Sequence, residues 1–189
     1  LMYGGNANFY NIGVGEYPAI LDMLEEIAGN QSWVIPSIGP DFGRAVDQAK
    51  ILRDRAFPTA MVLPLTFPST PEGAEAGIRR IVEAYAKPVI VYIKNEGFLE
   101  PENVARLFAD GMVAGIKYAI VRDDPKRDDY LSELVKLVSP KHIVSGIGER
   151  PAIDHLRHFG LACFTSGSVC IAPAGSMALR AALKAKDYE

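Results

Sequence analysis

The sequence predicts an α/β fold in which parallel strands alternate with helices. Short apolar runs recur along the chain, and a segment with helical spacing of apolar residues follows each run. Consecutive parallel strands need a crossover, which an intervening helix supplies. Polar residues gather where successive strands end, and that pattern favours a (β/α)8 TIM barrel over an open doubly wound sheet.

The first part of the chain holds two units of this pattern. Residues 1–4 have the character of the end of a strand, and a helix is predicted over 16–28. The apolar residues that predict this helix are Ile20, Met23, Leu24 and Ile27. The next strand covers 33–38, and Trp33 at its start is expected in the core. Asp41 is placed to cap a helix over 41–55. The apolar face of that helix consists of Ala45, Val46, Ala49 and Leu52.

The same unit repeats over the rest of the chain. Further strands are predicted at 60–65, 88–93, 113–121, 142–145 and 161–165. Further helices are predicted at 72–85, 101–110, 128–138, 151–158 and 173–184. Each predicted strand is therefore followed by a helix.

Polar side chains at the strand ends indicate where a site would lie. They are Asn6, Ser37, Thr66, Tyr92, Lys117, Ser145 and Ser166. A barrel keeps its active site at that end of its strands, and a complete barrel has eight strands and about 250 residues. The chain has 189 residues. We expect a single barrel-type domain over 1–189 that lacks its first β/α unit, with the absent strand before Leu1, and that also lacks a C-terminal extension.

Composition excludes several classes of function. The chain carries 20 Lys+Arg against 23 Asp+Glu, and this balance argues against a nucleic-acid partner. No apolar run is long enough to predict a membrane span. Cys163 and Cys170 have the spacing of neither a disulfide framework nor a zinc ribbon. We expect a cytoplasmic protein that needs no metal and no cofactor.

A lysine interrupts the apolar run at 113–121. Burial disfavours the charged form of an amine, so the pKa of Lys117 is expected to be low and part of the amine neutral near neutral pH. A neutral amine can attack a carbonyl group and form a Schiff base. Gly115 lies on the same side of the strand and is expected to leave room for a small substrate. Alternatively, the stem of Lys117 follows the core and its ammonium group reaches water.

Several motifs along the chain resemble one enzyme family. They are Gly115-Ile116-Lys117, the strand that ends at Tyr92, Leu63-Pro64 with Glu72-Gly73, Ser145-Gly146, and Ser166-Gly167 with Pro173. In this order they resemble the dihydrodipicolinate synthase/N-acetylneuraminate lyase family of class I aldolases. The resemblance implies that Lys117 forms a Schiff base with a 2-keto acid, usually pyruvate, and that Tyr92 shuttles protons. Lys94 is the rival amine, but its polar neighbours indicate a wetter setting.

The chain departs from the family at several positions of the substrate pocket. Gly5 and Asn6 stand where the family has two hydroxyl residues that hold the carboxylate, and Thr66 stands where it has a tyrosine of its proton relay. The arginine of dihydrodipicolinate synthases is replaced around Gly97. We expect Asn6, the Gly5 backbone, Thr66 and the Thr165 carbonyl to line the pocket, and a substrate other than that of a true dihydrodipicolinate synthase.

The sequence leaves two functions open. One is a lyase or aldolase that acts through a lysine Schiff base on a 2-keto acid or sugar-acid derivative. The other is a noncatalytic barrel that binds a small acid and has a regulatory or assembly role. Relatives bring an aromatic residue from the loop that holds Asn8, Phe9 and Tyr10 toward a neighbouring subunit, so a homo-oligomer, either a dimer or a tetramer, is expected.

Overall fold

The computed structural model of the protein describes residues 1–28, 32–65 and 67–188. Its strands are β1 Met2–Tyr3, β2 Ile35–Ile38, β3 Met61–Val62, β4 Val89–Ile93, β5 Val113–Tyr118, β6 Ile143–Ser145 and β7 Cys163–Phe164. Its α-helices are α1 Tyr17–Ala28, α2 Phe42–Leu52, α3 Pro71–Tyr85, α4 Pro101–Ala109, α5 Asp129–Leu137, α6 Glu149–His158 and α7 Pro173–Ala185. Every predicted helix and strand is present, within a few residues of its predicted bounds.

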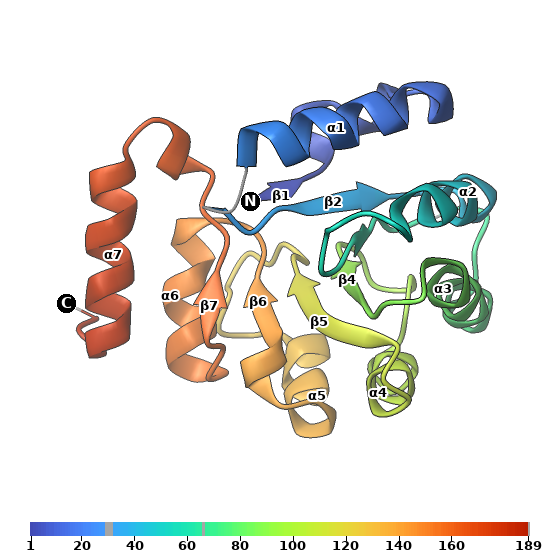
Figure 1. Cartoon of the computed structure of the whole chain (residues 1–189). Helices are drawn as coiled ribbons and strands as arrows, with labels where there is room; N and C mark the ends of the chain where they lie inside the picture. The colour runs from blue at the N-terminus through green and yellow to red at the C-terminus, as the bar shows by residue number, and fades with distance from the viewer. Residues whose placement is uncertain (29–31, 66, 189) are drawn as a thin grey trace.

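The strands form one parallel sheet whose spatial order is the sequence order. Each strand pairs with its successor from β1 to β7, as the alternation of strands and helices predicted. The sheet curls, and helices cover its outer face (Figure 1). The parallel α/β architecture is therefore confirmed. Among the described residues β1 pairs only with β2 and β7 only with β6, so the closed eight-stranded barrel stays a prediction.

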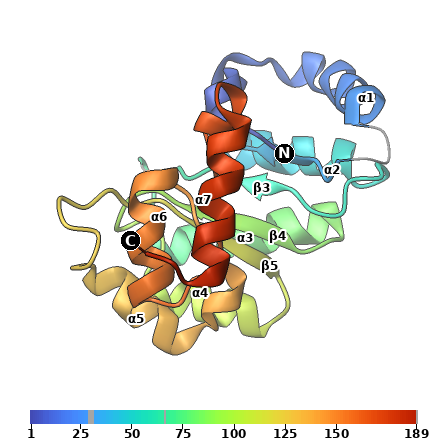
Figure 2. The same cartoon turned by 90° about the vertical axis from the view of Figure 1, so that its left-hand side faces the viewer.

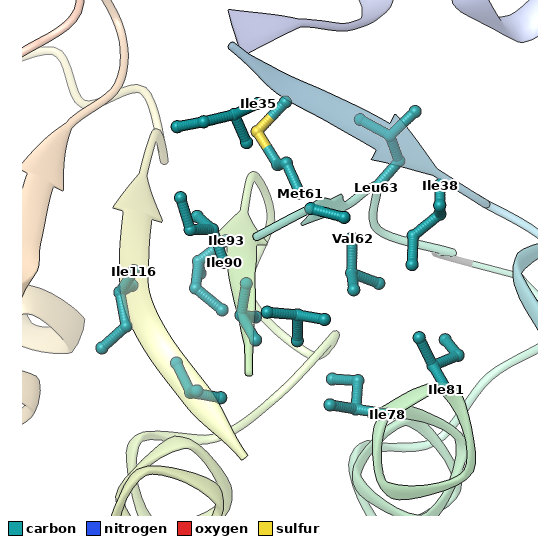
Figure 3. Close-up of a cluster of buried hydrophobic side chains, with 14 of the residues drawn as sticks. Ile35, Ile38, Met61, Val62, Leu63, Ile78, Ile81, Ile90, Ile93 and Ile116 are labelled. Carbon is teal, nitrogen blue, oxygen red and sulfur yellow. The ribbon is translucent and has the colours of Figure 1, made fainter. Parts of the chain in front are cut away.

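The core lies between the sheet and its helices. The strands from β2 to β5 contribute branched residues, and Ile78 and Ile81 of α3 face them in Figure 3. Ile78, Ile81, Ile93 and Ile116 are fully buried. Each such side chain contributes about 1.5–3 kcal/mol through removal from water. Figure 2 shows α7 running alongside α6 at the β7 end of the molecule.

Two helices begin at side chains that bind their free backbone amides. Thr70 precedes α3, and its hydroxyl accepts a hydrogen bond from the Gly73 amide at 3.1 Å. Asp128 precedes α5, and its carboxylate accepts one from the Leu131 amide at 2.9 Å. Such caps satisfy amides that have no partner within the helix and stabilise it by about 1 kcal/mol.

One core assignment made from the sequence is wrong. Trp33 is 63% exposed, although its apolar surface and its place before a strand predicted burial. Trp33 precedes β2, and its backbone is held in place: its carbonyl accepts a hydrogen bond from the backbone nitrogen of Leu1 at 2.6 Å. The indole side chain points away from the core. In the described part of the chain, no helix is both long and apolar enough to cross a membrane.

Candidate active site

A cavity of about 400 Å³ opens at the carboxyl ends of the strands. Its wall comes from the loop after β1 and from the ends of β3, β4, β5 and β6. The lining residues are Met2, Gly4, Gly5, Asn6, Ala7, Tyr10, Met61, Tyr92, Lys94, Lys117 and Gly146. Four of the six residues that we predicted for the site therefore meet here: Lys117, Tyr92, Gly5 and Asn6.

Lys117 lies beside Tyr92 because β4 and β5 are paired in register. Tyr92 is the direct partner of Lys117 in the parallel ladder. The Lys117 amine lies 4.0 Å from the centre of the Tyr92 ring, within the range of a cation–π contact. Burial lowers the pKa of Lys117, and the charge of Lys94 lowers it further. A larger fraction of the amine is therefore neutral and nucleophilic than in a free lysine.

The room for the Lys117 side chain comes from Gly146 and not from Gly115. A methyl group on Gly146 would meet the Lys117 Cγ at 2.7 Å and the Tyr118 carbonyl oxygen at 2.9 Å. On Gly115 it would meet the His142 carbonyl oxygen at 3.5 Å, which is an ordinary contact, and Gly115 does not line the cavity. The expectation for Gly115 is thus corrected, because the next strand, β6, approaches the lysine stem more closely.

The phenol of Tyr92 is protonated near neutral pH and can act as a proton donor. Burial raises the pKa of Tyr92, and Tyr10 adds to the effect. The hydroxyl group therefore keeps its proton near neutral pH, where it can donate the proton and then recover one.

The loop after β1 closes one side of the cavity. Gly5 and Asn6 belong to a 3-10 turn over Gly5–Ala7. A methyl group on Gly5 would lie 2.8 Å from the Tyr10 ring, so the tyrosine packs over the bare backbone. Tyr10 lines the cavity of its own chain, while Phe9 is fully buried and packs edge-on against Tyr3 and Tyr17.

The other two predicted site residues are not among the lining residues. Thr66 lies outside the described residues. The Thr165 amide donates to the Ser145 carbonyl at 2.8 Å, as a ladder bond continued past β7. Thr165 follows β7 directly, at the same end of the sheet as the cavity.

The six polar residues at the strand ends that the structure describes divide into two groups. Asn6, Tyr92 and Lys117 line the cavity. The three serines instead make structural bonds: Ser37 donates to the Tyr3 carbonyl at 2.6 Å, Ser145 bonds the His155 ring at 2.8 Å, and Ser166 donates to Glu149. A place at a strand end does not separate these groups. The direction of each side chain decides whether it lines the cavity or makes a structural bond.

A buried polar network that the sequence did not reveal holds the exits of β4 and β5 together. The Tyr118 hydroxyl donates to the carboxylate of Asp128, which is 1% exposed. Arg122 donates to Asp128 at 3.1 Å and also to Glu96, which follows β4. Tyr118 is the residue after Lys117, so the network anchors the strand that presents the amine. Its signal in the sequence was the mixed charge run from Arg122 to Asp129, which resembles an ordinary solvated loop.

Neither the family models nor the curated proteins give a match to this sequence. Solved structures do. Dihydrodipicolinate synthase from Oceanobacillus iheyensis is 26% identical over 97% of this chain and 60% of its own, with a TM-score of 0.84. The enzyme from Bacillus clausii is 24% identical over 97% of this chain and 61% of its own, with a TM-score of 0.84.

N-acetylneuraminate lyase from Fusobacterium nucleatum, solved with pyruvate, is 16% identical over 94% of this chain and 59% of its own, with a TM-score of 0.74. At the identities of these last two enzymes the likeness shows the fold alone. The chain thus spans about three fifths of the length of the solved structures that it matches.

Proposed function

We propose that this protein is a divergent member of the dihydrodipicolinate synthase/N-acetylneuraminate lyase family, which it resembles in fold and in sequence. In this proposal it acts as a lyase on a 2-keto acid or sugar-acid derivative. The reaction proceeds through a Schiff base on Lys117. The observation that carries the proposal is the Lys117 amine, which lies in a cavity against the Tyr92 ring and has a lowered pKa.

The chemistry needs a neutral amine and a proton donor beside it. The Lys117 amine attacks the carbonyl carbon and forms a carbinolamine, which then loses water to give the imine. The two protons of the amine leave with the carbonyl oxygen in that water. Tyr92 gives a proton to the departing oxygen and takes one back from the nitrogen. Its raised pKa means that the phenol holds its proton before the reaction begins.

The imine then serves as an electron sink. When a carbon–carbon bond of the substrate breaks, the hydroxyl group beyond that bond loses its proton and becomes the carbonyl of the leaving aldehyde. The electron pair of the bond flows to the protonated imine nitrogen and gives an enamine. A proton then adds to the enamine carbon, and hydrolysis releases the keto acid. In a dehydratase, the carbon next to the imine would lose a proton, and the hydroxyl group on the following carbon would leave as water. Both reactions use Lys117 and Tyr92 in the same roles, so the choice between them rests on the substrate.

The substrate subsite lies in the loop after β1. The Asn6 side-chain amide can donate hydrogen bonds, and the backbone amide of Gly5 is a second donor in the same turn. Both residues line the cavity. We infer that they hold the carboxylate next to the carbonyl carbon. Thr66 and Thr165 remain predicted members of the same subsite.

The proposal is tested by reductive trapping on the full-length protein. Borohydride with a panel of 2-keto acids should add the mass of the reduced substrate, and peptide mapping should place it on Lys117 rather than Lys94. Lys117→Arg keeps the charge but has no nucleophilic amine, so it should give no adduct while the protein stays folded. Absence of any adduct on the folded wild-type protein contradicts the proposal.

A noncatalytic barrel that binds a small acid is the second candidate. It is favoured by the absence of hydroxyl side chains at Gly5 and Asn6. Such a protein would bind a keto acid in calorimetry, would tolerate Lys117→Arg and would give no covalent adduct. A closing eighth strand, a dimeric or tetrameric assembly and a cytoplasmic setting belong to the lyase proposal as predictions.

A further inference from the structure

The cavity holds two lysines, and the lyase chemistry uses only one of them. Lys117 and Lys94 both line the wall, and in the described part of the chain no acidic residue lines it with them. An imine occupies the Lys117 nitrogen, so that amine cannot also serve as an ion-pair partner for the substrate. Lys94 is the cation left over.

Lys94 has no protein partner in the described residues. The nearest carboxylate along the chain is Glu96, and it accepts a hydrogen bond from Arg122 instead. Arg122 is also bound to the buried Asp128, which keeps it and Glu96 together on the β5 side. Lys94 is thus an exposed cation in the cavity wall that no carboxylate of the described residues neutralises.

The position of Lys94 suits a group of the substrate that lies some way from the carbonyl carbon. Tyr92 and Lys117 form a register pair, and Lys94 is two residues beyond Tyr92, on the same side and toward the open end. Two residues advance a strand by about 6.6 Å. The carboxylate next to the carbonyl carbon stays near the Lys117 nitrogen, where Asn6 and the Gly5 amide are available.

We propose that Lys94 is a specificity-determining residue that binds a second carboxylate, and that the protein therefore takes dicarboxylic 2-keto acids in preference to monocarboxylic ones. The inference rests on the proposed lyase function of the same site. A cavity of about 400 Å³ is large enough for an acid of five or six carbons. A charge-assisted hydrogen bond at this point contributes enough to discriminate between the two classes.

The test compares 2-oxoglutarate with 2-oxopentanoate, which has the same chain length without the second carboxylate. The half-saturating concentration for reductive trapping is measured for both acids on the full-length protein. The wild-type value for 2-oxoglutarate should be at least about tenfold lower. Lys94→Met should weaken the binding of 2-oxoglutarate alone, so the ratio of the two half-saturating concentrations should fall to about one. Lys94→Arg should keep most of the wild-type ratio.

The ratio separates recognition from any effect of Lys94 on the reactivity of Lys117, since that effect is common to both acids. Lys136→Met, on the exposed side of α5, is the matched control and should leave the ratio unchanged. A wild-type ratio near one, or equal changes for both acids in Lys94→Met, overturns the inference and leaves the lyase proposal standing. No adduct with either acid or with pyruvate overturns both.

Discussion

Two glycines lie near Lys117, Gly115 in its own strand and Gly146 after β6, and only Gly146 makes room for the lysine side chain. We expect Gly146→Ala to push the lysine stem aside, because the new methyl group would come within 2.7 Å of the Lys117 Cγ. A displacement of about 1 Å lowers the rate of a positioned reaction by about 100-fold. Gly115→Ala, whose closest contact is 3.5 Å, is the control and should retain the rate. Equal trapping rates in the two variants would contradict this role of Gly146.

The charge of Lys94 should be visible in the pH dependence of Lys117. Trapping speeds up as the Lys117 amine loses its proton, so the midpoint of the rise should lie below the value of about 10.4 for a free lysine. Lys94 lowers the pKa of Lys117, after the larger effect of burial. Lys94→Met removes that charge, and the midpoint should move to higher pH.

Trapping rates measured from roughly pH 6 to pH 10 check this shift. Lys136→Met, with the same loss of charge far from the cavity, should leave the midpoint unchanged. A midpoint in Lys94→Met at or below the wild-type value would show that the Lys117 amine does not sense Lys94.

At the scale of the elements, Glu75 joins α3 to α4. Its carboxylate accepts hydrogen bonds from Arg106 at 2.7 Å, Asn103 at 2.8 Å and Arg79 at 3.0 Å. These donors, Arg106 first, lower the pKa of Glu75 to about 2 against the opposing effect of burial. A carboxylate with a lowered pKa stabilises the fold above its unfolded pKa, and the contribution is lost as the pH falls through its folded pKa.

Glu75→Gln should therefore lower the free energy of unfolding by about 1 kcal/mol at pH 7. The gap to the wild type should close as the pH falls from about 4.5 to about 2. Urea titrations at several pH values measure it. Glu83→Gln, on the exposed side of the same helix, is the control. A gap that does not change with pH would mean that Glu75 acts through packing alone.

The polar network around Asp128 should contribute more to the free energy of unfolding than Glu75 does, because Asp128 is buried. Asp128→Ala removes the cap of α5 and leaves Tyr118 and Arg122 without their acceptor. Removal of one member of a buried charged pair costs about 3–5 kcal/mol. Thermal unfolding measures the loss, and Asp124→Ala, whose partner Arg127 is exposed, should cost less than about 0.5 kcal/mol. Similar melting temperatures for the two variants would contradict the structural role of the network.

At the scale of the whole molecule, the sheet has two edges in the described residues. β1 and β7 each have one neighbour, so each presents unpaired backbone groups, and unprotected edges favour pairing between chains. Large apolar side chains are also exposed, among them Ile171 at 90% and Phe67 at 84%. We expect the 189-residue chain, expressed by itself, to self-associate or aggregate.

Size-exclusion chromatography with light scattering, under reducing conditions, checks this expectation. Cys163→Lys places a charge on the exposed edge strand β7 and should reduce the association, whereas Cys163→Ser should not. A monomer that melts in one cooperative transition would contradict the prediction.

The sequence alone determined the order and kind of the elements, because the spacing of apolar residues is a local property that each segment carries. It also singled out Lys117, since an amine inside an apolar strand is visible in the local pattern. Tyr92 was one of several polar residues at strand ends, and the family resemblance marked it out. In the structure these two residues are register partners, and their side chains meet.

The tertiary structure alone decided what surrounds the amine. Gly146 lies far from Lys117 in sequence, and only the pairing of β5 with β6 brings it against the lysine stem. The sequence placed Lys94 in a wetter setting, and the structure confirms that it is exposed, but only the tertiary structure shows that it also lines the cavity. Likewise, the exposure of Trp33 depends on which segment covers it. Distances between residues of different strands follow from the curl of the sheet, and no local pattern contains them.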